Sequence, residues 1–97
     1  MTFKEDILRK INSDFGEKSN EVIEILSDAI KKTNYLETDR IVRCIIFLSK
    51  GNIDNLNKFI EMATLDPRDI MLWAEYEKLN DDFKFKRIRN FGRAFDD

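Results

Sequence analysis

Apolar residues recur along the chain with the spacing of amphipathic α-helices. Phe3, Ile7, Ile11 and Phe15 follow one another every four residues, which predicts a helix over about residues 3–15. Similar stripes predict three more helices, which run from Ser19 or Asn20 to Thr33, from Thr38 or Asp39 to Lys50, and from Asn52 or Asp54 to Ala63.

The third of these stretches is apolar on almost every side. Its sequence, RIVRCIIFLSKG, leaves almost no polar face, and a helix that is apolar most of the way round is buried most of the way round. β-branched residues are also typical of strands. The Thr-Asp start and the Lys-Gly end favour a helix.

The clearest helix start in the chain is the tetrapeptide at residues 66–69. Asp66 is suited to cap the helix, Pro67 to occupy its first position, and Asp69 to reach back towards the cap. This fifth helix is expected to carry Ile70, Met71, Trp73, Ala74 and Leu79.

A sixth, short helix is the expectation for the end of the chain. Asn80, Asp81 and Asp82 break or restart the preceding helix, and Phe85, Ile88, Phe91 and Phe95 then recur every three or four residues. The predicted fold class is therefore all-α, a compact bundle or short stack of helical hairpins with five to six helices.

Composition agrees with one small helical domain over residues 1–97. The 97-residue length suits a single core, and three Gly and one Pro are too few for an all-β sandwich or barrel. The longest apolar run, residues 44–48, is far shorter than the ~20 residues that span a bilayer, which excludes membrane insertion. One cysteine and no signal-peptide pattern favour the cytoplasm.

Charge is distributed unevenly between the body and the end of the chain. The net charge is -2, but residues 84–95 carry five cations and no acid. We expect this basic and aromatic segment, residues 83–97, to dock its Phe side chains on the acidic body. A protein or self-association interface is the first alternative, and binding to nucleic acid or to an anionic membrane surface is the second.

The acids and aromatic residues after Pro67 have two interpretations. Glu75 and Glu77 lie two apart on a helix and so point to different sides, which argues against a catalytic carboxylate pair. Capping and a solvated surface are the favoured roles of these acids, and the alternative is that Asp69 or Glu75 acts singly in a pocket. Trp73 is expected in the core with Tyr76 at its edge. The alternative is a patch for a partner, formed with Met71 or Leu72.

Several chemistries lack the residues that they need. The chain has no His and one Cys, so no usual zinc site or Cys–His nucleophile is available, and the apolar surroundings of Cys44 raise the pKa of a thiol. Calcium loops and glycine-rich phosphate loops are also missing from the sequence. We therefore expect no enzyme activity, cofactor or metal.

Residues 40–77 resemble a pattern found in short bacterial proteins whose function is not established. The shared features are the Arg-apolar-Cys run that ends in FL, a turn with Gly51, the motif D-x-R-D, and the tripeptide AEY. This resemblance implies a free-standing small bacterial protein, and it draws attention to Arg68, Asp69 and Glu75.

The sequence therefore predicts a small, non-catalytic protein interaction domain, with an adaptor or regulatory role. The alternative is nucleic-acid binding through the C-terminal segment. The expected partner is another protein or a second copy of the chain. The candidate partner surface comprises Arg68, Met71, Trp73, Glu75, Tyr76, Lys84, Lys86, Arg87, Arg89 and Arg93.

Overall fold

The computed structural model describes residues 3–79 and 84–95. The elements in chain order are α1 (Glu5–Phe15), α2 (Ser19–Lys32), α3 (Asp39–Ser49), α4 (Ile53–Leu65), α5 (Pro67–Glu75), β1 (Tyr76–Leu79) and β2 (Lys84–Arg87). Short 3-10 turns, Gly16–Lys18 and Asn34–Leu36, follow α1 and α2. The predicted helical class is confirmed, and the departure from it is the pair of short strands.

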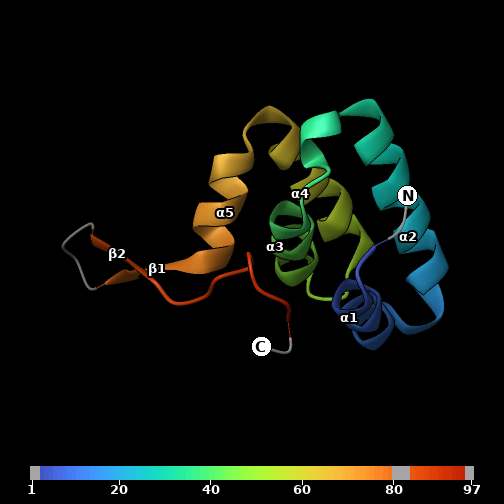
Figure 1. The fold of residues 1–97 in the computed structure, drawn as a ribbon, viewed down its shortest axis with the longest axis horizontal. Helices are drawn as coiled ribbons and strands as arrows, with labels where there is room; N and C mark the ends of the chain where they lie inside the picture. The colour runs from blue at the N-terminus through green and yellow to red at the C-terminus, as the bar shows by residue number, and fades with distance from the viewer. Residues whose placement is uncertain (1–2, 80–83, 96–97) are drawn as a thin grey trace.

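Helix α3 lies at the centre of the helical body. It packs against α4 and α5, and it also contacts α1, while α2 packs against α1 and α4. In Figure 1 α3 is surrounded by the other helices, and the segment after β2 passes below it towards α1. This central position agrees with the nearly continuous apolar sequence of α3.

The core is built mainly from the stripes of aliphatic residues. At most 1% of the surface is exposed for core residues such as Ile7, Ile11, Val22, Leu26, Cys44, Ile46 and Leu56. Among the helices within residues 3–79 and 84–95, none has the length and apolar character needed to cross a membrane.

The turn between α3 and α4 depends on backbone conformations with positive φ. Lys50 has a φ of 50° and Gly51 a φ of 74°. A Cβ atom on Gly51 would overlap the carbonyl oxygen of Asp14 at the end of α1, so this close approach requires glycine. The Asn52 side chain then caps α4 by accepting the Asn55 N–H at 3.0 Å.

Helix α5 begins as the sequence predicts, but it ends earlier. Asp66 caps it by accepting the Arg68 N–H at 3.0 Å, and Pro67 is its first residue. The helix stops at Glu75, so the placement of Leu79 on this helix is wrong: residues Tyr76–Leu79 form β1. The expected break at Asn80–Asp82 lies outside the described residues.

Strands β1 and β2 form an antiparallel hairpin that projects from the helices (Figure 1). Tyr76 pairs with Arg87, and Leu79 pairs with Lys84. The molecule is 42 Å along its longest axis, and the hairpin occupies one end of that axis.

The sixth helix predicted over Phe85, Ile88, Phe91 and Phe95 is wrong. Phe85 lies in β2, and the residues after Arg87 form bends and turns. The backbone N–H groups of residues 88 and 89 donate to the carbonyl of Glu75 at 2.8 and 3.1 Å. These two donors therefore bond to a carbonyl outside their own segment, in place of the carbonyls that a helix would offer them.

Candidate functional site

The carboxylate of Glu75 joins four parts of the fold. It is fully buried at the end of α5. Arg40 on α3 donates to it through Nε, at 3.0 Å, and through Nη2. Arg87 at the end of β2 donates from Nη2 at 3.3 Å, and the Phe91 N–H donates at 2.9 Å. Glu75 therefore ties the C-terminal segment, defined here as residues 88–95, to α3, α5 and β2.

A second buried carboxylate, Asp6 on α1, holds the far end of the same segment. Arg43 on α3 donates to it through Nε at 2.9 Å and through Nη2 at 3.1 Å. The remaining nitrogen of Arg43, Nη1, donates to the Phe91 carbonyl at 3.1 Å. The Phe95 N–H donates to Asp6 at 3.0 Å, so the Asp6–Arg43 pair fastens the segment across α1 and α3.

Both carboxylates stay charged because hydrogen bonds and neighbouring arginine charges lower their pKa values more than burial raises them. Burial alone raises the pKa of Glu75, but hydrogen bonds from Arg40 and Phe91 and the nearby arginine charges bring the pKa below its ordinary value. For Asp6, burial again raises the pKa, and the bonds from Arg43 and Phe95 lower it further than burial raises it. The two sites, Glu75 with Arg40 and Asp6 with Arg43, are here called the clamps, because their ion pairs and hydrogen bonds hold the C-terminal segment on the helices.

Aromatic side chains seat the C-terminal segment on the helical body. Phe91 is buried and packs against Phe47, with ring centroids 5.1 Å apart, and against Phe95 at 5.5 Å. The guanidinium of Arg89 lies 4.5 Å from the centre of the Phe47 ring, and its Nη1 donates to the Ala74 carbonyl at 3.2 Å. The rings of Phe47, Phe91 and Phe95 therefore contact other side chains of the fold.

Three adjoining hollows lie along the C-terminal segment. Their volumes are about 430, 420 and 290 Å³. The first shares Lys10 with the second, and Arg89 and Arg93 with the third. Among the residues that line these hollows, Asp14 carries the single carboxylate. The cations that line them, here called the basic face, are Lys10, Lys50, Arg87, Arg89 and Arg93.

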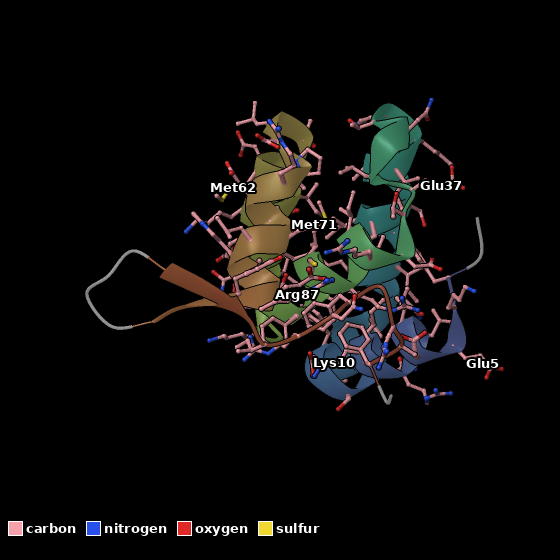
Figure 2. The ribbon with its side chains drawn as sticks, turned by 60° about the vertical axis from the view of Figure 1, so that its left-hand side comes forward. Glu5, Lys10, Glu37, Met62, Met71 and Arg87 are labelled. Carbon is pink, nitrogen blue, oxygen red and sulfur yellow. The ribbon has the colours of Figure 1, made fainter. Side chains whose placement is uncertain are left out.

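The members of the basic face differ in how far they are already engaged. Lys10 pairs with Asp14 at 3.3 Å. Arg87 and Arg89 bond within the fold, as described above. Lys50 and Arg93 are exposed, so they are the cations that an incoming anion reaches most directly. In Figure 2 the labelled Lys10 and Arg87 lie below Glu37.

One expectation for the candidate surface, that of Glu75, and one for the core, that of Trp73, are wrong. Glu75 is fully buried in an ion-pair cluster and is therefore neither a solvated acid nor part of a surface. Trp73 is 51% exposed instead of lying in the core, and its ring meets the Phe59 ring edge-on at 6.4 Å. Because α5 ends at Glu75, Tyr76 starts β1 and is not a helical neighbour of Trp73.

The remaining candidates are dispersed over different parts of the surface. Arg68 is exposed and bonds to Asp66 at 3.1 Å, next to the start of α5. Met71 is half-buried against the core. Lys84 and Lys86 lie in β2, and their side chains are outside the described residues. The structure therefore brings together Arg87, Arg89 and Arg93 around one hollow, and neither Arg68 nor Met71 lines the hollows of this face.

The structure also adds residues that the sequence did not bring forward. Lys10 and Lys50 join the basic face from α1 and from the turn after α3. The buried pairs use Asp6, Arg40 and Arg43. A signal for Arg43 was present, since a charged residue inside a helix that is apolar on all sides requires a buried partner.

The Cys44 thiol and the potential metal ligands are not arranged for chemistry in the described part of the chain. Cys44 is fully buried, and burial raises the pKa of its thiol to about 12. Among residues 3–79 and 84–95, no group of three or more potential ligands is placed to hold a metal ion.

Comparison with known proteins finds no family model, no curated protein and no solved structure that matches this chain. The resemblance of residues 40–77 to short bacterial proteins stays a prediction.

Proposed function

We propose that this protein is a non-catalytic interaction domain that binds an acidic surface of a partner protein through the basic face. The observation that carries the proposal is the lining of the three adjoining hollows, where five cations meet a single carboxylate. Opposite charge across an interface speeds association and selects the partner. The buried clamps at Asp6 and Glu75 support the role, because they fix the segment that carries Arg89 and Arg93, and Glu75 also binds Arg87.

The arrangement of the aromatic rings favours an acidic protein over nucleic acid. Binding of single strands generally combines cations with exposed rings on which bases stack. Here Phe91 is buried, and Phe47 is covered by Arg89 on one side and packed against Phe91. The chain as a whole is acidic, with a net charge of -2, which opposes a long polyanion.

Nucleic-acid binding is the alternative, and the five clustered cations are the feature that favours it. It predicts an affinity for single-stranded DNA or RNA that falls steeply with salt, with a log–log slope of roughly -0.7 for each phosphate contacted. Absence of binding at low salt would eliminate this alternative.

The proposed setting is the bacterial cytoplasm, because the chain has one cysteine and resembles short bacterial proteins. Self-association is the competing form of protein binding, and light scattering of the purified chain separates it from capture of a different protein.

The test is partner capture from bacterial lysate after nuclease treatment, followed by mass spectrometry and by affinity measurement with the purified partner. The charge-reversed variant Arg93→Glu/Lys50→Glu is compared with Lys31→Glu/Lys32→Glu, which changes the net charge equally in the last turn of α2. Loss of the partner with the first variant alone supports the proposal. Equal capture by both contradicts it.

Point substitutions are preferable to deletion of the C-terminal segment. Deletion would remove Phe91 from the core and would take one hydrogen-bonding partner from each of Arg43 and Glu75. A truncated chain that failed to bind would therefore report a loss of folding as readily as a loss of the interface.

A further inference from the structure

The β-hairpin has two open edges. In the described part of the chain its sheet consists of β1 and β2 alone, so each strand has one edge without a sheet partner. Figure 1 shows the hairpin extending away from the helices. An open strand edge is a template for an additional strand, because its N–H and C=O groups are available for pairing.

The register identifies which backbone groups of β2 face outward. The Ile88 N–H donates to the Glu75 carbonyl at 2.8 Å, so residues 75 and 88 form a hydrogen-bonded pair. The next pair along the ladder, Tyr76 with Arg87, is therefore a non-bonded pair. Hydrogen-bonded pairs alternate with non-bonded pairs in an antiparallel ladder. The N–H and C=O groups of Phe85 and Arg87 therefore point to the outer edge of β2.

Charge distinguishes the two edges. β2 has the sequence KFKR, with three cations in four residues, whereas β1 has the sequence YEKL, with one acid and one base. Pairing of β2 with β2 of a second copy would place cations opposite cations, which is destabilising. An acidic strand is the complementary partner. β2 also leads directly into the basic face, because Arg87 belongs to both.

We propose that the outer edge of β2 accepts an extended acidic segment of the partner protein as a third strand. The backbone bonds come from the groups at Phe85 and Arg87, and the following acidic residues of the partner continue onto the basic face. In this mode main-chain bonds supply affinity and alternate side chains supply selectivity. The inference rests on the proposed function and adds the way in which the partner binds.

The test uses a fluorescent peptide that alternates Glu with Val, and an analogue of equal charge with N-methyl groups on alternate amides. Anisotropy measures both affinities for the full chain, and amide exchange by NMR follows the N–H groups of residues 85 and 87. Removal of two hydrogen bonds is expected to weaken the methylated peptide about tenfold or more. Exchange at residues 85 and 87 should slow when the plain peptide binds.

Protein variants provide an independent readout. Phe85→Pro removes an N–H that faces away from β1, so it blocks strand addition without breaking a bond within the hairpin. Phe85→Ala retains that N–H and is the matched control. We expect the proline variant alone to reduce plain-peptide binding to the level of the methylated peptide, with the helical circular dichroism unchanged in both.

Each opposing result has a distinct meaning. Equal binding of the two peptides, with both weakened by Arg93→Glu/Lys50→Glu, overturns strand addition and leaves the basic face as the proposed binding surface. If the plain peptide fails to bind, strand addition is overturned. If a single-stranded oligonucleotide then binds in its place, the nucleic-acid alternative is favoured. Peptide binding that is insensitive to the charge reversal contradicts both proposals.

Discussion

Replacement of Glu75 by Gln should be among the most damaging single-atom changes in this protein. The side chain is fully buried and accepts from Arg40, Arg87 and the Phe91 N–H. Breaking one partner of a buried ion pair generally costs about 3–5 kcal/mol. Arg40 and Arg87 have 35% and 39% of their side-chain surface exposed, so water can solvate both after the substitution. The expected loss is therefore near the lower end, about 3 kcal/mol.

Urea unfolding followed by circular dichroism measures this loss. For a domain of this size, about 3 kcal/mol corresponds to a fall in Tm of roughly 12–24 °C. Glu61→Gln, the same chemical change on the exposed side of α4, is the control and should cost less than about 0.5 kcal/mol. Trypsin should also cleave the Glu75→Gln variant faster after Arg89 and Arg93, because the C-terminal segment has lost one of its two clamps.

A double-mutant cycle with Arg40→Met tests the cause of the loss. If the Glu75–Arg40 pair carries the stability, the double variant should lose less than the sum of the two single losses, with a coupling of about 1–3 kcal/mol. A Glu75→Gln variant as stable as Glu61→Gln would refute the buried clamp. Additive single losses would refute the pairing with Arg40.

Three further predictions concern other parts of the fold. Glu75 and Asp6 have lowered pKa values in the folded chain, so the unfolded chain binds more protons in acid. Their contribution to the free energy of unfolding is complete above about pH 5 and is lost as the pH falls through the folded pKa values. Urea unfolding between about pH 5 and 3 should therefore show a shallower decline for Glu75→Gln than for the unaltered chain. Gly51→Ala should destabilise the fold more than Gly16→Ala. Both positions have positive φ, but the added Cβ meets the α1 backbone only at Gly51. The difference between the urea midpoints of the two variants measures the effect of that overlap. Cys44 should react with a thiol reagent at the rate of unfolding, and reaction as fast as a free thiol would contradict its burial.

The helices follow from local sequence, and this is why they were predictable. Stripes such as Ile7 and Ile11 repeat with the helical period, and the caps at Asn52 and Asp66 lie next to the helices that they start. No information from distant parts of the chain is needed for these features. The one helix predicted in error is the one whose backbone has distant partners.

The C-terminal segment has helical spacing, but its conformation is fixed by residues far away in sequence. Asp6 accepts the N–H of Phe95, 89 residues later, and Glu75 accepts the N–H of Phe91, 16 residues later. Such pairings are invisible to periodicity. Arg43 could have drawn attention to them, because its position inside an apolar helix requires a buried carboxylate.

The candidate surface was predictable only in part for the same reason. The sequence placed Arg87, Arg89 and Arg93 in one basic segment, whereas Lys10 and Lys50 reach it through the packing of α1 and α3. Trp73 was assigned to the core by residue type, yet the fold places it half-exposed on α5. Large aromatic residues have mixed burial, so residue type alone does not decide such a position.

The most direct test of the basic face is the dissociation constant of the captured partner for three chains, measured by titration calorimetry. Arg93→Glu/Lys50→Glu should weaken binding at least about tenfold relative to the unaltered chain, since reversal of interface charge removes attraction and adds repulsion. Lys31→Glu/Lys32→Glu should bind within about threefold of the unaltered chain. Equal weakening by both variants would show that only net charge matters, and it would contradict the assignment of the basic face as the binding surface.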